Sequence, residues 1–306
     1  MDLDPSFKLV GTTWVFKIKR DHLRNIIEHK SCLCVQGFTQ SAGVDFGQTY
    51  SPTGRLNLLS TLIASAASNN LKFHQVDIKS TFLNTLLAKT AIYGLKQAPL
   101  AWYEGLRTWF QSVGFSLCIL DTCVFFRGGD DPVWLYIHID DIAIFGSRVD
   151  SLKRELKQEF EIIDLGQADL LLRIKITHSD EFVSLDQQHF TESLLDLYGM
   201  RNCKPVSTPL IPNDHLEESN DSEAQEFQAL NINYCSTIGG INYLSTATRP
   251  DLSFSVSALS QFLEKPGIRH WKAFLHVLKY LKRTQDLSIT YPKGINAGII
   301  AYTDAD

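Results

Sequence analysis

The sequence is poor in residues that could build a disulfide framework or a metal–thiolate centre. Its six cysteines are scattered along 306 residues, and no two of them have the CxxC spacing of a zinc module. Long apolar runs are also missing, since none approaches the ~18 residues of a membrane-spanning helix. The opening segment MDLDPSFKL lacks the apolar core of a secretion signal. We therefore expect an intracellular protein, cytoplasmic or nuclear, without a membrane partner.

A large excess of one charge is missing as well, because the formal net charge is only −5. This balance by itself speaks against a nucleic-acid partner, but the charges are unevenly distributed. Cations cluster near the start and again near the end, and an acidic stretch over 214–226 lies between them. Solvated surfaces also explain these runs, so charge alone does not identify a partner. The second cationic cluster consists of Lys265, Arg269, Lys272, Lys279, Lys282 and Arg283.

Apolar residues make up 44% of the chain, which is enough for a sizeable core, and their spacing predicts an α+β fold. We expect a sheet that contains a hairpin and is backed by helices. The acidic stretch 211–228 is the best candidate for a linker. The expected strands are 14–19, 73–78, 133–139, 142–145, 170–176, 182–185 and 299–302. The expected helices lie within 58–66, 100–113, 149–160, 190–195, 238–244 and 271–281.

The segment VWLYIHIDDIAIFG (133–146) places two adjacent carboxylates, Asp140 and Asp141, between two apolar strands. Aspartate is common in turns for local hydrogen-bonding reasons, so the pair could be no more than a turn. A two-residue hairpin loop prefers Asn-Gly or Asp-Gly, however, because its backbone needs positive φ. Asp-Asp fits that need poorly, which leaves room for a chemical role.

A third carboxylate, Asp77, belongs to another short apolar strand, in FHQVDIKSTFLN (73–84). Together with Asp140 and Asp141 it could bind divalent cations, because Mg²⁺ prefers oxygen ligands. Two such ions about 4 Å apart stabilise the attacking and the leaving oxygen of a phosphoryl displacement. An unrelated two-metal hydrolase is a further alternative, which has no support beyond these carboxylates.

The order of motifs along nearly the whole chain resembles the reverse transcriptase of copia-type retrotransposons, a region of their Pol polyprotein. TTWVFKIKRD (12–21) and QVDIKSTFLN (75–84) are similar to the fingers and the first palm motif, and YGLKQAPLAWY (93–103) and the IDD hairpin to the next palm motifs. Any one motif is weak, but so many in the same order are specific. The other matching segments are VQGFTQSAGVDFGQTYSP (35–52), FEIIDLGQADLLL (160–172), GMRNCKPVSTP (199–209), TRPDLSFSV (248–256), HWKAFLHVLKYLKRT (270–284) and AYTDAD (301–306).

The resemblance implies an RNA-directed DNA polymerase that extends a primer with deoxynucleotides on an RNA or DNA template. Asp77, Asp140 and Asp141 would be its catalytic carboxylates and would bind two Mg²⁺ ions, with Mn²⁺ as a possible substitute. The 3′-hydroxyl of the primer would attack the α-phosphate of the incoming nucleotide, and pyrophosphate would leave. The oligomeric state is open.

Three further residues take substrate-binding roles from the resemblance. Phe82 would crowd a ribose 2′-hydroxyl, Lys30 would contact the triphosphate, and Gln97 would contact the nucleotide through its sugar or the minor groove. Without the family, Phe82 is a core residue and Lys30 a surface lysine. The cationic cluster over 265–283 would follow the phosphate backbone of a hybrid duplex, with affinity that falls steeply with salt.

The implied architecture is a right-hand polymerase with a connection segment and the truncated start of a ribonuclease H domain. Residues 1–160 would form the fingers and palm, with an internal deletion near 85–92, and 161–230 a thumb-like segment and the acidic linker. Residues 231–296 would be the connection, and 297–306 the first ribonuclease H strand. The partners of Asp304 in that domain would lie beyond residue 306, so we expect no ribonuclease H activity.

Departures from the family pattern predict that this copy is impaired. Cys32 stands where the family has an arginine that would neutralise the triphosphate, and a thiol cannot replace its bidentate contact. The connection between the Asp77 and Gln97 motifs is shortened to LLAKTAI, which would expose apolar surface or unpair a strand. The remaining departures are His138 for tyrosine, Leu100 for arginine and Arg173 for glycine.

Two interpretations from different classes therefore stay open. The first is a polymerase domain with an intact carboxylate triad. The second is a catalytically dead remnant that acts, if at all, as a nucleic-acid-binding or interaction protein. The triad favours the first, and Cys32 and the shortened segment favour the second.

Overall fold

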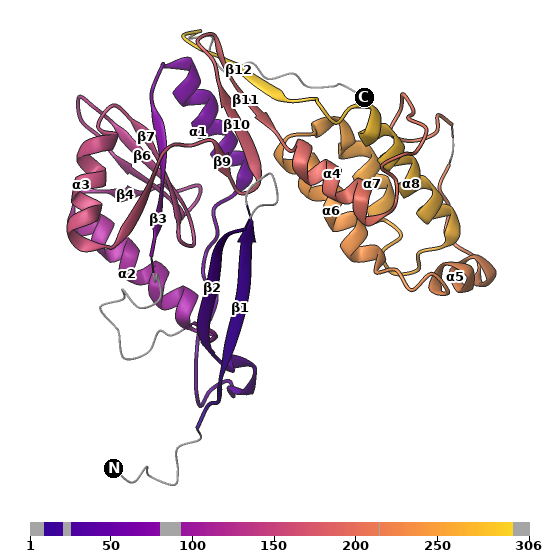
Figure 1. The fold of residues 1–306 in the computed structure, drawn as a ribbon, viewed down its shortest axis with the longest axis horizontal. Helices are drawn as coiled ribbons and strands as arrows, with labels where there is room; N and C mark the ends of the chain where they lie inside the picture. Colours follow the sequence, from indigo (N-terminus) through magenta and orange to yellow (C-terminus); the bar gives the residue numbers. More distant parts are fainter. Residues whose placement is uncertain (1–8, 21–25, 80–92, 214, 296–306) are drawn as a thin grey trace. The chain divides into compact units, whose positions relative to one another are not determined.

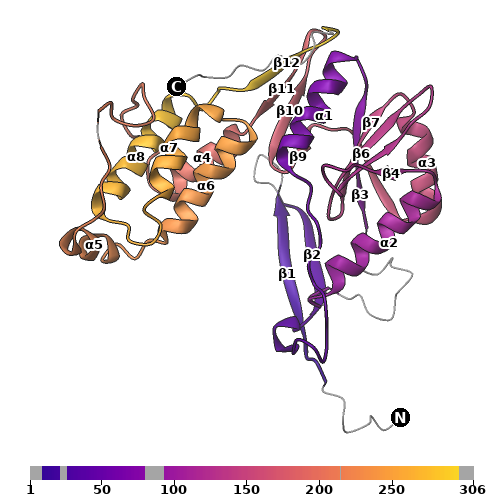
Figure 2. The ribbon, with the colours of Figure 1, turned by 180° about the vertical axis from the view of Figure 1, so that it is seen from behind.

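The computed structural model describes residues 9–20, 26–79, 93–213 and 215–295, and Figures 1 and 2 show it from opposite sides. The chain forms two compact units. The first unit comprises Met1–Arg55 and Lys72–Gln167, and the second comprises Leu56–Leu71 and Ala168–Asp306. The chain therefore enters the second unit once for a single helix and returns to the first unit before it enters the second again.

The first unit contains a six-stranded antiparallel sheet of order β4-β5-β6-β7-β3-β8 and a separate hairpin, β1-β2. Two helices, α2 and α3, accompany the sheet (Figure 1). The elements of this unit are β1 (Thr12–Arg20), β2 (Ile26–Val35), a short 3₁₀ helix (Gly37–Thr39), β3 (Phe73–Ile78), α2 (Ala98–Ser112), β4 (Ser116–Leu117), β5 (Val124–Arg127), β6 (Val133–His138), β7 (Asp141–Gly146), α3 (Val149–Glu159) and β8 (Ile162–Gln167).

One face of this sheet packs against helices α2 and α3. Val76 and Ile142 are fully buried with Leu106 of α2 and Leu152 of α3, in one apolar cluster. Because successive residues of a strand point to opposite faces, Asp77, the neighbour of Val76, points to the face away from α2 and α3. The helices thus cover one face, and the opposite face of β3 and β7 carries Asp77 and Asp141 at one end and the buried pair Phe73 and Phe145 at the other.

A buried cation lies on the helix-covered face. Lys153 of α3 is only 4% exposed, and its Nζ lies 2.7 Å from His74 Nδ1 and 2.5 Å from Asp164 Oδ1. Burial and the charge of Lys153 lower the pKa of His74. Burial by itself would raise the pKa of Asp164, but the hydrogen bonds from Lys153 and from Gly166 N–H, together with the charges of Lys153 and Lys157, lower it overall. The network joins α3 to β8 and to β3, the strand that also carries Asp77.

The second unit contains a four-stranded antiparallel sheet of order β12-β11-β10-β9 and a group of helices. Helix α1 belongs here because Gly294 N–H donates to Ala67 O at 3.2 Å and Ser68 Oγ donates to Ile295 O at 2.6 Å. The elements are α1 (Leu56–Ser68), β9 (Leu170–Leu171), β10 (Ile174–His178), β11 (Phe182–Asp186), α4 (Gln188–Leu197), α5 (Asp221–Gln228), α6 (Tyr234–Ala247), a 3₁₀ turn (Pro250–Leu252), α7 (Ser253–Ser260), α8 (Ile268–Arg283) and β12 (Ile289–Pro292).

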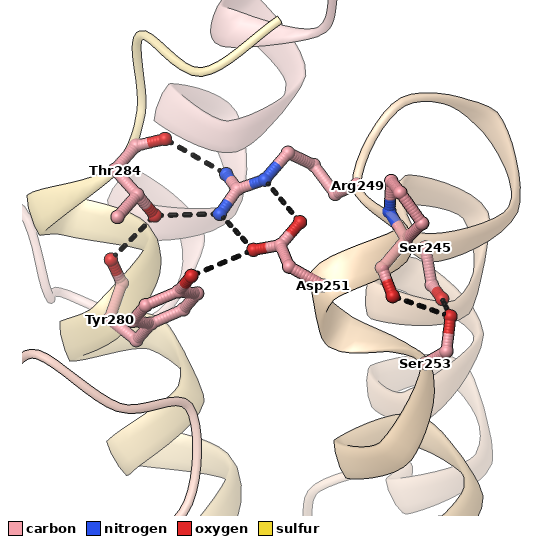
Figure 3. A network of polar contacts seen from close by, with 7 residues as sticks. Ser245, Arg249, Asp251, Ser253, Tyr280 and Thr284 are labelled. Atoms are coloured by element: carbon pink, nitrogen blue, oxygen red, sulfur yellow. Dashed lines mark hydrogen bonds and ion pairs between the residues drawn. The ribbon is translucent and has the colours of Figure 1, made fainter. Parts of the chain in front are cut away.

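A buried arginine fixes the end of α8 to the turn after α6 (Figure 3). Arg249, 3% exposed, donates to both carboxylate oxygens of Asp251, at 3.0 and 2.7 Å, and to the backbone carbonyl of Thr284 at 2.9 Å. Tyr280 OH also donates to Asp251, at 2.9 Å. Burial would raise the pKa of Asp251, but these hydrogen bonds hold it below its usual range. The TRPD motif therefore has a structural role.

Three expectations from the sequence need correction. The loop of the carboxylate hairpin is Ile139-Asp140, because His138 pairs with Asp141 and Asp141 already belongs to β7. The strand expected over 170–176 is two strands joined by a turn. Part of the expected linker is helix α5, because Asn220 and Glu223 form a capping box at its start.

Other expectations are not tested by the structure. The expected strand at 299–302 and the proposed ribonuclease H segment lie outside the described residues. The division into fingers, palm, thumb-like segment and connection stays a prediction. In the part of the chain that the structure describes, no helix is long and apolar enough to cross a membrane.

Candidate active site

The register of three neighbouring strands brings two of the expected carboxylates together. Asp77 of β3 lies directly opposite Asp141 of β7, which lies opposite His138 of β6. Directly opposed residues of an antiparallel pair point to the same face, with Cβ atoms about 5 Å apart. Asp77, Asp141 and His138 therefore form one row on the sheet face that α2 and α3 leave open.

The third carboxylate, Asp140, lies in the two-residue loop between β6 and β7. Its backbone carbonyl accepts a hydrogen bond from Ile78 N–H at 3.1 Å, which ties the loop to the end of β3. The preceding Ile139 has φ of 62°, a conformation that is an outlier for a β-branched residue. Trp102 Nε1 of α2 donates to Ile139 O at 2.8 Å and holds the loop in this conformation.

Burial raises the pKa of Asp141 above its usual value. A hydrogen bond from Gln75 Nε2 to Asp141 Oδ1, at 2.9 Å, opposes this shift, and the nearby charge of Asp140 adds to it. A partly buried carboxylate beside other carboxylates favours a cation at the site, because a cation offsets both burial and repulsion. Gln75 was missed by sequence reasoning, although its position two residues before Asp77 puts it on the same face.

The donor set fits Mg²⁺ in chemistry, since all three side chains offer carboxylate oxygens. Within the described ranges, however, no three carboxylate, histidine or cysteine side chains converge as a metal site. The structure therefore brings Asp77 and Asp141 side by side and places Asp140 on the adjoining loop, and it does not gather the three into one ligand cage.

Gln97 begins α2 and is fixed by a buried glutamine. Gln40 Nε2 donates to Gln97 Oε1 at 3.1 Å, and Gln40 Oε1 accepts from Lys96 N–H at 2.9 Å. The backbones approach closely here, because a Cβ on Gly37 would lie 1.9 Å from Gly94 O. The Gln97 carboxamide is thus oriented by its oxygen, and Gln40 is a second residue that sequence reasoning missed.

Lys30 lies in the β1-β2 hairpin, away from Gln97. It is exposed in the middle of β2, five residues before Val35, whose N–H donates to Tyr93 O. At about 3.3 Å per residue, the strand separates Lys30 from that contact by about 16 Å. Lys17 lies directly opposite Lys30 in the β1-β2 ladder. Phe82 lies outside the described residues.

A comparison with protein families gives a decisive match. The model described as "Reverse transcriptase (RNA-dependent DNA polymerase)" matches residues 1–90 and 86–212, more than half of the chain. The chain belongs to the reverse transcriptase family. The resemblance inferred from the order of motifs is thereby confirmed.

Curated relatives agree with this assignment. The Pol polyprotein from transposon TNT 1-94 of Nicotiana tabacum is 31% identical over 327 aligned residues, which cover 96% of this chain and 24% of the relative. The Pol polyprotein from transposon RE2 of Arabidopsis thaliana is 31% identical over 99% of this chain and 22% of its own length. This reverse transcriptase chain thus spans about a quarter of the length of these relatives. No solved structure matches it significantly.

The departures of this reverse transcriptase chain occupy identifiable positions. Cys32 lies two residues after Lys30 in β2 and so faces the same side of the hairpin. Leu100 is part of the first turn of α2. His138 Nδ1 is buried and has no hydrogen-bond partner among the described residues. Arg173 has φ of 61° in the turn between β9 and β10, where glycine is favoured.

The cationic cluster of this reverse transcriptase chain divides into paired and unpaired members. Lys265 Nζ lies 2.7 Å from Asp221 Oδ1, and Arg269 Nη2 lies 2.8 Å from Glu223 Oε1. These two cations therefore pair with the acidic stretch. The other members have no acidic partner within 4 Å in the part of the chain that the structure describes; they are Lys272, Lys279, Lys282 and Arg283.

Proposed function

We propose that this chain derives from an RNA-directed DNA polymerase that uses two divalent cations, and that the copy is catalytically impaired. The observation that carries the proposal is the opposition of Asp77 and Asp141 across β3 and β7, with Asp140 on the adjoining loop. The family match supports a nucleic-acid template and nucleotide substrates in general terms. The two-metal mechanism and the impairment go beyond that match.

The three aspartates would hold Mg²⁺, or Mn²⁺ in its place. When bound, two such ions neutralise the phosphate charge and bring the primer 3′-hydroxyl and the α-phosphate together. The chain's own contribution is position: the β3-β7 register aligns Asp77 with Asp141, and the Trp102 hydrogen bond to Ile139 O fixes the loop that presents Asp140. Gln75 orients Asp141 by its hydrogen bond at 2.9 Å.

Substrate binding would use the hairpin and the start of α2. Lys17 and Lys30 are directly opposed like charges, an unfavourable pair that a phosphate group between them would relieve. Gln97, held by Gln40 through its oxygen, keeps its amide donors for a nucleotide. Phe82 would select deoxynucleotides by the family's rule, although it lies outside the described residues.

Three observations support impairment. Cys32 adds no positive charge beside Lys30. The family model matches in two segments that meet at residues 86–90, within the part where the sequence predicts a deletion. The alignment with the tobacco relative extends over 327 positions whereas this chain has 306 residues, so that relative contains residues this chain lacks. The alternative of a catalytically dead remnant that binds nucleic acid is favoured by the same observations.

Primer extension on an RNA template distinguishes these alternatives. The purified chain would be tested with deoxynucleotides and Mg²⁺ or Mn²⁺, beside an Asp140→Asn variant that keeps the loop length. We expect weak extension that the substitution abolishes. Robust synthesis would disprove impairment, and no synthesis from a well-folded chain would leave only the non-catalytic alternative.

A further inference from the structure

Helix α8 carries a line of cationic and histidine side chains along one side. The helix has 3.6 residues per turn, so positions spaced by three and four residues lie on one narrow arc. The arc is separate from the buried face that Phe274, Leu278 and Leu281 form. Fourteen residues at 1.5 Å each give the line a length of about 21 Å. Its members are Arg269, Lys272, His276, Lys279 and Arg283.

Acidic side chains already form ion pairs with the cations at the N-terminal end of this line. Arg269 lies 2.8 Å from Glu223 and 3.7 Å from Glu217, and the neighbouring Lys265 lies 2.7 Å from Asp221. The hydrogen bond from Lys265 lowers the pKa of Asp221, as expected for a favourable ion pair. A phosphate would have to displace these carboxylates to reach either cation.

A pocket of about 340 Å³ opens beside the middle of the line. Lys272 and Lys279 line it together with Arg269, whose guanidinium is paired with Glu223, and with apolar side chains of the preceding segment such as Leu210 and Leu216. That segment is attached to α8, because His276 Nε2 lies 3.1 Å from Thr208 O. Cations beside an apolar wall suit a ligand that alternates anionic groups with less polar ones.

A nucleic-acid strand has this alternation of phosphate and sugar. Lys272 and Lys279 are seven residues apart, which is about 10.5 Å along the helix, so the two cations can reach different phosphates of one strand. Beyond the pocket the line continues to Arg283, with Lys282 beside it, so it is longer than a small anion requires. The alternative, that Lys282 and Arg283 only complement the helix dipole, does not account for Lys272 at the other end of the helix.

We propose that Lys272 and Lys279 bind phosphates of a template–primer duplex at this pocket, whereas Lys265 and Arg269 are structural ion-pair partners that contribute little to binding. The inference rests on the nucleic-acid part of the proposed function and is independent of catalysis. It divides a cluster that looks uniform in sequence into binding and structural residues.

The test is fluorescence anisotropy of a labelled RNA–DNA hybrid duplex titrated with the full chain, in EDTA and without nucleotides. Lys272→Gln and Lys279→Gln are compared with Lys265→Gln and Arg269→Gln, which remove the same charge from neighbouring positions. One phosphate contact contributes a salt slope of about 0.9, so each of the first two substitutions should lower affinity about eightfold at 0.1 M salt. The two controls should change affinity less than about twofold, because a cation that stays paired with a carboxylate neutralises no phosphate and so releases no counterion from the duplex.

Several outcomes overturn the proposal. They are no binding of the duplex by the parent chain, equal losses in all four variants with unchanged circular dichroism spectra, a flat salt response, or displacement of the duplex by a poly-glutamate peptide at equal charge concentration. Absent primer extension together with intact, Lys272-dependent binding would remove the polymerase proposal and leave this one standing.

Discussion

Two hairpin loops of this chain hold residues other than glycine at positive φ, in different chemical surroundings. In the first unit Ile139 has φ of 62°, and Trp102 Nε1 donates to its carbonyl. In the second unit Leu172 and Arg173 have φ of 51° and 61°, and Tyr243 OH donates to the carbonyl of Leu172. Both loops have two residues, and in both an aromatic side chain from a helix holds the first carbonyl.

The loops differ in what the strained conformation achieves. The first presents Asp140 beside Asp77 and Asp141, so strain there fixes the geometry of the candidate site. The second carries no residue of that site, and at Arg173 the resembling family has glycine, which adopts positive φ without strain. The same backbone feature is thus a candidate functional device in one unit and a candidate defect in the other.

The largest change in stability is expected from removal of the Trp102 hydrogen bond to Ile139 O. Trp102→Phe deletes the N–H donor to Ile139 O and part of a side chain that is 2% exposed, so we expect a loss of about 2 kcal/mol in the free energy of unfolding. Urea denaturation measures it. Trp109→Phe is the matched control, because Trp109 also lies in α2 and packs on Phe160 but is only half-buried. Equal losses in both variants would show that this hydrogen bond contributes nothing to the free energy of unfolding.

Restoration of glycine in the second loop should stabilise the chain. Arg173→Gly removes the strain of a side chain at φ of 61°, and we expect a gain of about 1 kcal/mol, measured by urea denaturation. Arg173→Ala is the control, because alanine removes the charge but keeps the Cβ atom. A gain with alanine as large as that with glycine would assign the effect to charge and contradict strain.

Neutralisation of Asp141 should stabilise the first unit and abolish any activity. Burial raises the pKa of Asp141, so its contribution to stability is fully present below its unfolded pKa and is lost as pH rises through the folded pKa. Asp141→Asn should therefore raise the free energy of unfolding at pH 7 by up to about 1 kcal/mol, the scale of partly exposed charges. Unfolding curves at pH 4 and pH 7 measure this, and a gain that does not shrink at pH 4 would refute the interpretation.

The smallest change in stability is expected for Ile139→Gly. Glycine relieves positive φ here as at Arg173, but it also removes an apolar side chain whose residue is 43% exposed and otherwise buried, whereas Arg173 is exposed. The two effects oppose each other, so the net change should stay within about 0.5 kcal/mol. Any primer extension should fall, because Asp140 is then held less firmly. Extension rates for the variant, beside the stabilised Arg173→Gly chain, measure the contrast. Unchanged extension would show that the Ile139 conformation is not needed for Asp140.

Sequence reasoning located the carboxylates but not the residues that organise them. The sequence showed Asp77 in a short apolar strand, and alternation along β3 puts Gln75, two residues earlier, on the same face as Asp77. Gln40 and Trp102 could not be found in this way. Their roles depend on contacts with residues 57 and 37 positions away in the chain, Gln97 and Ile139, and no local pattern encodes such contacts.

The amino-acid sequence alone determined the family and the presence of both helices and strands, and it proposed the three carboxylates, because these inferences depend on residue order and local periodicity. Only the tertiary structure decided that Asp77 faces Asp141 and that the turn lies at Ile139-Asp140. It also decided that Lys265 and Arg269 are paired with carboxylates, whereas Lys272 and Lys279 have no acidic partner among the described residues. The physical reason is that strand register and ion pairing join residues distant in the chain. A one-residue slip in register, invisible in composition, would turn every side chain of a strand to the other face.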